Sequence, residues 1–158
     1  MLGVSALSSQ ERADTLVAAD VIRTVNGYSR YTVFDDVRVR VEGGAVTLEG
    51  KVTMAAKKAD IAKLVKDVDG VKSVRNDIGV LPASESDDDL RHRVARAIYG
   101  NAAFWQYAAM PNPPIHIVVE SGRVTLTGIV RSDAEKALAR SLATGHGQAS
   151  LQCDIAVK

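Results

Sequence analysis

The sequence of 158 residues is poor in cysteine and in net charge, and each scarcity excludes a class of protein. The single cysteine, Cys153, rules out an internal disulfide and a zinc site built from several thiolates. Lys plus Arg (20) nearly balances Asp plus Glu (19), which argues against a general nucleic-acid binder, because such proteins carry a basic excess. No apolar run approaches the roughly 20 residues of a membrane-spanning helix. What remains is the composition of an ordinary globular protein, 46% hydrophobic and 25% charged.

Sequence signatures of catalysis, metal binding and cofactor binding are missing as well. The three histidines, His92, His116 and His146, have no partner at the spacing of a zinc site. The glycine-rich turn at residues 145–147 follows a predicted helix, whereas a dinucleotide-binding loop follows a strand and opens a helix. The sequence also lacks a nucleophile elbow and a phosphate-binding loop. We therefore expect no enzyme, no catalytic residue, no metal and no cofactor.

The middle of the chain contains a repeat. Residues 41–52 read VEGGAVTLEGKV and residues 119–130 read VESGRVTLTGIV, and eight of the twelve positions are identical. Further matches upstream and downstream lie at offsets of 76 and 77 residues, close to the 78 of the central match, so length differences are confined to loops. An ordered series of this kind indicates a tandem duplication. We predict a first domain at residues 9–81, a linker and helix cap at 82–89, and a second domain at 90–158.

Each copy shows the same order of local signals. In the first copy an apolar stripe at helical spacing ends at Asn26–Gly27, and valines then alternate with arginines over residues 37–41. Gly43–Gly44 fits a two-residue hairpin turn in which both residues have positive φ. A second apolar stripe runs from Ile61 to Val68, and a last strand ends at Val80. The prediction is an α+β protein of two small repeated domains, each αββαβ, with a three-stranded mixed sheet covered on one face by two helices.

Serine motifs predict where helices begin. Ser8-x-x-Glu11 and Ser132-x-x-Glu135 are capping boxes, in which the hydroxyl and the carboxylate satisfy free amides at a helix start. Ser86 precedes the first helix of the second copy, and Asp87–Asp89 follow it as charges favourable to the helix dipole.

Glycine recurs at one position inside a predicted strand of each copy, as Gly50 and Gly128. Glycine weakens a strand, so its recurrence suggests a local need for it. We expect either the close approach of a helix or a bulge at these positions.

Together these motifs resemble the BON domain, which occurs in bacterial envelope and osmotic-stress proteins. The resemblance rests on the Gly43–Gly44 hairpin, the V-T-L-x-G-x-V strand at residues 46–52, the second helix, and the G-V-x-x-V-x-N-x-I-x-V segment at residues 70–80. It covers nearly all of residues 9–158 as two copies. It implies a non-enzymatic module that associates with phospholipid membranes or envelope components, and it carries over no catalytic residue.

The second copy departs from this pattern at two places. Gly145-His146-Gly147-Gln148 replaces residues 68–71 of the first copy. Cys153 stands where the first copy has Asn76. These departures affect the geometry of one loop and leave the fold prediction unchanged.

The aromatic residues (one Trp, four Tyr, two Phe) all lie between the first helix and the first strand of a copy. They can fill the open end of a small core, or form an exposed surface for lipid or a partner. We favour the core for Tyr28, Tyr31 and Phe34. Residues 104–110 hold too many large side chains for all to point inward, and beside them lie the arginines of the preceding helix. The candidate surface for an anionic lipid or a partner comprises Arg91, Arg93, Arg96, Phe104, Trp105, Tyr107 and Met110.

The function expected from these features is association with anionic phospholipid surfaces in the periplasm or cell envelope, in osmotic or envelope stress. Residues 90–158 hold eight Lys or Arg against four Asp or Glu, an excess that suits anionic headgroups. One alternative is a protein interaction module acting through a sheet edge or the aromatic loop, and another is a domain that senses a small ligand or an ion. The apolar start Met1–Leu7 fits the remnant of a trimmed export signal or a plain N-terminal extension, the latter compatible with a cytoplasmic location.

Overall fold

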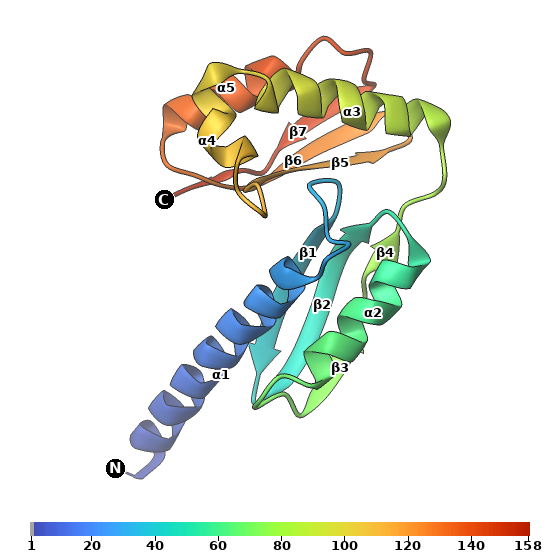
Figure 1. Ribbon diagram of the computed structural model, residues 1–158. Coiled ribbons are helices and arrows are strands. Elements are labelled where there is room, and N and C mark those ends of the chain that lie inside the picture. The colour runs from blue at the N-terminus through green and yellow to red at the C-terminus, as the bar shows by residue number, and fades with distance from the viewer. Residues whose placement is uncertain (1) are drawn as a thin grey trace. The chain divides into compact units, whose positions relative to one another are not determined.

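The computed structural model describes the backbone of residues 2–158 and the side chains of residues 13–158 (Figure 1). The chain divides into two units. The first consists of Met1–Tyr31 and Val37–Val80, and the second of Thr32–Asp36 and Leu81–Lys158. Both units have the same αββαβ order, which confirms the predicted fold class of two repeated α+β domains.

The first unit is a mixed sheet with two helices on one face (Figure 1). Its central strand β2 lies between β1 and β3, and the third strand is interrupted, so that β3 and β4 both pair with β2 in parallel. The interruption occurs where the Asp77 N–H donates to the Leu48 carbonyl at 2.8 Å. The elements are α1 (Leu2–Gly27), β1 (Asp36–Glu42), β2 (Ala45–Val52), α2 (Ala55–Lys66), β3 (Ser73–Asn76) and β4 (Gly79–Val80).

The second unit repeats this arrangement and adds a short helical segment before its first strand. Strand β6 is central, antiparallel to β5 and parallel to β7 and β8. The elements are α3 (Glu85–Tyr99), the 3₁₀ helix η1 (Ala102–Phe104), α4 (Trp105–Ala108), β5 (Ile115–Glu120), β6 (Arg123–Val130), α5 (Asp133–Ala143), β7 (Ser150–Cys153) and β8 (Ala156–Val157).

Each unit has its own hydrophobic core between the sheet and the helices. Along the central strands every second residue faces the helices and, except for Gly50 and Gly128, is buried, as the alternation of side chains across a pleated strand requires. In the first unit Val46 and Leu48 of β2 pack against Ile61 of α2. In the second unit Leu126 of β6 and Ile98 of α3 are fully buried. The open face of each sheet carries the intervening residues.

Two of the expected helix starts need correction. Helix α3 begins at Glu85, and its N-cap is Ser84, whose hydroxyl accepts the Asp87 N–H at 3.3 Å. Ser86 lies inside the first turn, because the cap must stand three residues before the amide that it satisfies. Helix α1 begins at Leu2 rather than at Ser8. The capping box of Ser8 and Glu11 and the signal remnant in the first seven residues involve side chains outside the described part of the chain.

Other local predictions are confirmed. Ser132 caps α5 by accepting the Glu135 N–H at 3.1 Å. Both residues of the first hairpin turn have positive φ, Gly43 at 58° and Gly44 at 80°. The altered loop of the second copy keeps a left-handed glycine, since Gly147 has φ 85° where Gly70 of the first copy has φ 87°.

Gly128 is explained by a neighbouring backbone and not by a helix. Its φ is 115°, and a Cβ at this position would lie 1.8 Å from the carbonyl oxygen of Pro114, which precedes β5. The glycine inside β6 therefore permits the backbone at Pro114, just before edge strand β5, to approach closely.

Candidate functional site

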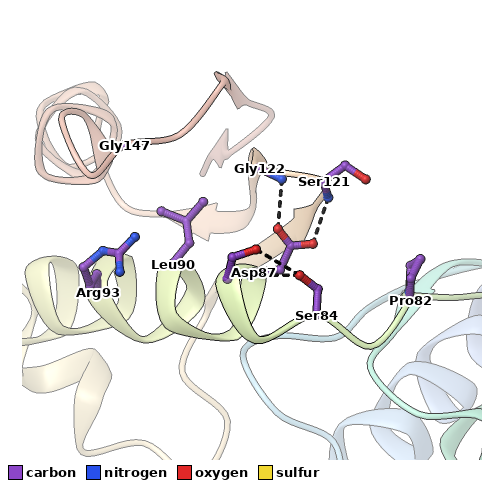
Figure 2. A pocket seen from close by; sticks show the side chains of 9 residues that line it. Pro82, Ser84, Asp87, Leu90, Arg93, Ser121, Gly122 and Gly147 are labelled. Atoms are coloured by element: carbon purple, nitrogen blue, oxygen red, sulfur yellow. Dashed lines mark hydrogen bonds between the residues drawn. The ribbon is translucent and has the colours of Figure 1, made fainter.

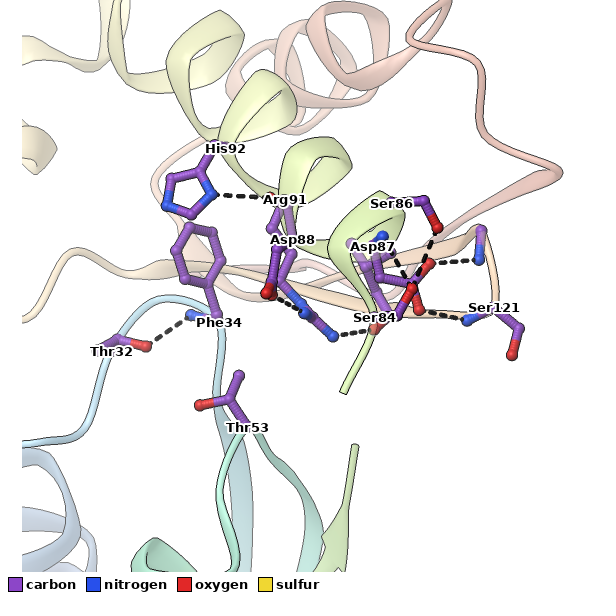
Figure 3. A network of polar contacts seen from close by, with 12 residues as sticks. Thr32, Phe34, Thr53, Ser84, Ser86, Asp87, Asp88, Arg91, His92 and Ser121 are labelled. Carbon is purple, nitrogen blue, oxygen red and sulfur yellow. Dashed lines mark hydrogen bonds and ion pairs between the residues drawn. The ribbon is translucent and has the colours of Figure 1, made fainter. Parts of the chain in front are cut away.

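Arg91 does not belong to an exposed surface, although the sequence suggested that it does. Its side chain is buried, forms an ion pair with Asp88 and donates from Nη2 to the Val119 carbonyl at 2.6 Å. Arg91 lies on the side of α3 that packs against β5, so its guanidinium stabilises the contact between these two elements. Figure 3 shows Arg91 and its ion pair with Asp88.

Arg93 and Arg96 are exposed on α3. With Asp89 and His92 they line a shallow hollow of about 400 Å³. Arg93 also donates from Nη2 to the His146 carbonyl at 3.2 Å, which holds its side chain near the loop after α5. These two arginines remain available to an anionic ligand.

The aromatic segment divides between the core and the surface. Phe104 is 0% exposed and Tyr107 is 5% exposed, and their rings stack at 6.0 Å between centroids. Trp105 is 63% exposed and Met110 is 39% exposed. The expectation of a continuous surface over these four residues is therefore wrong for Phe104 and Tyr107, because residues three apart on the helical turn of η1 and α4 face the same side, here the core.

Tyr107 is anchored by a polar cluster that sequence reasoning missed. Its hydroxyl donates to Glu135 Oε2 at 2.6 Å, and the same oxygen accepts the Arg131 N–H at 3.0 Å. The Arg131 guanidinium lies over the Tyr107 ring at 5.4 Å. The hydrogen bond from Tyr107 and that from the Arg131 backbone lower the pKa of Glu135. Burial, then the hydrogen bond to Glu135, raises the pKa of Tyr107.

What the segment presents to solvent is a small mixed patch. We call it the tryptophan patch and define it as Trp105, Gln106, Met110 and Arg131. The Trp105 indole donates weakly to the Gly100 carbonyl at 3.4 Å, and Arg131 contacts the Gln106 amide oxygen at 3.4 Å. An apolar ring with a wet edge and a nearby guanidinium is the combination found where proteins meet a membrane surface.

A second hollow, of about 400 Å³, lies at the N-terminal end of α3 (Figure 2). Within it the buried carboxylate of Asp87 accepts hydrogen bonds from the backbone N–H groups of Ser121 at 2.8 Å and Gly122 at 2.9 Å. Both carboxylate oxygens are thus used to fasten α3 to the β5–β6 turn. Asp87 lies in the first turn of α3, as expected of a charge that favours the helix dipole, and it also forms this tether.

The histidines all bond to main-chain carbonyls. His92 Nδ1 contacts the Asp88 carbonyl at 2.7 Å, His116 Nδ1 the Asp35 carbonyl at 2.5 Å, and His146 Nε2 the Leu142 carbonyl at 2.8 Å. Among the residues with described side chains, no three acidic, histidine or cysteine side chains gather at a position that holds a metal. Nor does any helix in that part of the chain have the length and apolarity needed to cross a bilayer.

Comparison with known proteins identifies both repeats. The sequence profile of the BON domain matches residues 13–82 and again residues 86–157. A search of curated proteins finds no match. Among solved structures, CdsD, a structural protein of the type III secretion system of Chlamydia trachomatis, is 15% identical over 88% of this chain and 92% of that chain, with a TM-score of 0.31. A structure of the C-terminal domain of CdsD is 11% identical over 88% of this chain and 98% of that chain, with a TM-score of 0.29.

Proposed function

Because the chain belongs to the BON domain family, whose domains are non-catalytic modules associated with membrane and envelope binding, we propose that it binds the surface of anionic phospholipid membranes. The observation that carries the proposal is the 63% exposure of Trp105 in a unit that also exposes Arg93, Arg96 and Arg131. The lipid-contacting residues of this proposal are therefore the tryptophan patch, Arg93 and Arg96.

The physical basis is a short-range apolar contact combined with a longer-range charge attraction. An indole ring seats at the headgroup level, with its apolar body toward the acyl chains and its N–H in water. Each arginine near an anionic leaflet contributes about 1 kcal/mol of attraction when salt does not screen it. Neither term is large, so the module is expected to bind reversibly.

The test is co-sedimentation of the full chain with vesicles of phosphatidylglycerol and phosphatidylcholine, and with vesicles of phosphatidylcholine alone. We expect binding to the anionic vesicles only, weakened by high salt. Trp105→Ser and the double variant Arg93→Glu/Arg96→Glu are each expected to weaken binding, the latter about tenfold or more.

Matched controls lie in the first unit. Leu16→Ser removes an apolar side chain that is 68% exposed, close to the exposure of Trp105. Arg38→Glu/Arg40→Glu makes the same charge change as the α3 double variant, at two exposed positions of β1. Equal loss in the control and test variants would contradict a role for these residues, and no binding of the wild-type chain to anionic vesicles would refute the function itself.

The proposed location is the periplasm or the cell envelope, in a role tied to osmotic or envelope stress. The support is the family to which the two repeats belong. Fractionation of cells that express the chain from its own gene tests the location, and recovery in the cytoplasmic fraction alone would contradict it.

A second candidate function is protein binding through a sheet edge. One observation favours it: the outer edge of β5 already receives a segment of the chain distant in sequence, because the Ile117 N–H donates to the Val33 carbonyl at 2.7 Å. An edge strand that pairs with such a segment is capable of strand addition.

A further inference from the structure

The second unit is assembled from two stretches of chain. Thr32–Asp36 follow α1 in sequence, yet they group with Leu81–Lys158. We call these five residues the docked segment. Its contacts with β5 and α3 define a site that no sequence motif predicts.

Main-chain contacts hold the docked segment along the outer edge of β5. Strand β5 pairs with β6 on its other side and is an edge strand of its sheet. The Ile117 N–H donates to the Val33 carbonyl at 2.7 Å, and His116 Nδ1 donates to the Asp35 carbonyl at 2.5 Å. These bonds use backbone carbonyls, so they impose no requirement on the docked side chains.

The side chain of Phe34 supplies the specific contact. It is half-buried and packs against the core of the second unit. Its ring centroid lies 5.2 Å from that of His92 at an interplanar angle of 60°. Figure 3 shows the two side chains next to each other. This tilted aromatic pair contributes beyond the burial of apolar area.

The docked segment is held in its own bound shape. The Asp35 side chain is 0% exposed, and its Oδ2 accepts the Thr32 N–H at 2.9 Å and the Thr32 hydroxyl at 3.1 Å. The Asp35 N–H donates back to the Thr32 carbonyl at 3.1 Å. A short turn closed in this way loses less conformational entropy on docking than a free extended strand would.

We propose that the outer edge of β5, with His92 and His116, is a peptide-binding site occupied here by the chain's own docked segment. The partner that fits it is a protein segment of the same chemistry: a hydroxyl residue, an aromatic residue two positions later, and an acidic residue next. The docked segment then acts as an internal competitor, and a partner gains access by displacing it. The proposal deepens the second candidate function and is independent of membrane binding.

The size of the contact explains why the docked segment is exchangeable. Two hydrogen bonds to main-chain carbonyls and one ring give modest affinity, and tethering in the same chain raises the effective concentration to about the millimolar range. Weakening the internal segment must therefore open the site to an added peptide. A partner in its natural context needs a second attachment to compete.

The experiment uses the full chain and a fluorescent peptide of residues 30–37, RYTVFDDV, measured by anisotropy. Wild-type protein is expected to bind the peptide weakly, and Phe34→Ala is expected to bind it about tenfold more tightly, because the internal ring no longer competes. Adding His92→Ala to Phe34→Ala should reverse the gain. Trp105→Ala is the control, since it removes an exposed aromatic of the same unit away from the site.

A peptide in which alanine replaces the phenylalanine should not bind any variant. Equal affinity of folded wild-type and Phe34→Ala protein for RYTVFDDV would overturn the proposal. If Phe34→Ala lacks a cooperative thermal transition, Phe34→Leu keeps an apolar side chain in the core and is expected to give a smaller gain in the same direction. Vesicle binding by the Phe34 and His92 variants is expected to be unchanged, so failure here and failure of membrane binding are separate results.

Discussion

Asp14 and Asp87 make the same contact in the two repeats. Each lies on the first helix of its unit and accepts two backbone N–H groups of the hairpin turn. For Asp14 the donors are Gly43 at 2.8 Å and Gly44 at 3.0 Å, and Asp87 repeats this with the turn of its own unit. The duplication thus preserved a helix-to-turn tether as well as the apolar pattern of the core.

Removing this tether should destabilise the second unit. Asp87→Ala leaves two turn N–H groups without their acceptor in a site where the aspartate is only 4% exposed, and we expect a loss of about 2–4 kcal/mol in the free energy of unfolding. Urea denaturation followed by circular dichroism measures it. Asp89→Ala, on the exposed side of the same helix, is the control and should change stability by less than about 0.5 kcal/mol. Equal effects of the two variants would show that the tether is unimportant.

Gly128→Ala should be severely destabilising. The added Cβ would meet the Pro114 carbonyl oxygen at 1.8 Å, and the φ of 115° is unfavourable for any residue with a side chain, so we expect a loss of about 3 kcal/mol or more. Gly145→Ala separates the two causes. Its φ of 87° is also positive, but nothing lies within 4 Å of its Cβ, and about 1 kcal/mol of strain is expected there. Thermal melts of both variants make the comparison.

The sequence was sufficient to predict the fold because the spacing of apolar residues in the first copy and in the second copy predicted the same elements. Alternating valines, the Gly43–Gly44 turn and the helical stripes each predicted one element, and the second copy supplied an independent check on all of them. The predictions failed for side chains whose chemistry suits both an exposed and a buried position. Arg91 is charged and lies among charged residues, yet its Nη2 donates to the buried Val119 carbonyl.

The candidate site was only partly predictable for a related reason. The number of large side chains in residues 104–110 indicated that some must be exposed, but which ones depends on the turn of η1 and α4. The docked segment was unpredictable, because neither its local sequence nor its distance from β5 in the chain signals a contact. The Asp14 tether was missed as well, because Asp14 and Asp87 are 73 residues apart whereas the upstream matches lie at an offset of 76.

The Tyr107–Glu135 hydrogen bond should make the stability of the second unit depend on pH in the acidic range. The folded-state pKa of Glu135 is lowered, so its contribution is present above the unfolded pKa of about 4.3 and is lost as pH falls through the folded value. Glu135→Gln should therefore lower the thermal midpoint at pH 7 and differ little from wild type at pH 3. Asp133→Asn, an exposed acid in the same first turn of α5, is the control for loss of charge at the helix start. A constant difference between Glu135→Gln and wild type across this pH range would contradict the assignment.

Arg91 and Arg93, two residues apart on α3, should respond oppositely in two assays. Arg91→Ala leaves the Val119 carbonyl unsatisfied and removes packing from a side chain that is 3% exposed, so we expect a loss of about 2–3 kcal/mol in unfolding free energy. Arg93→Ala should cost less than about 0.5 kcal/mol, because its side chain is exposed. On anionic vesicles the order should reverse: the folded Arg91→Ala protein binds like wild type, while Arg93→Ala binds more weakly. Weaker vesicle binding by folded Arg91→Ala protein would mean that this guanidinium reaches lipid, which its hydrogen bond to Val119 does not permit.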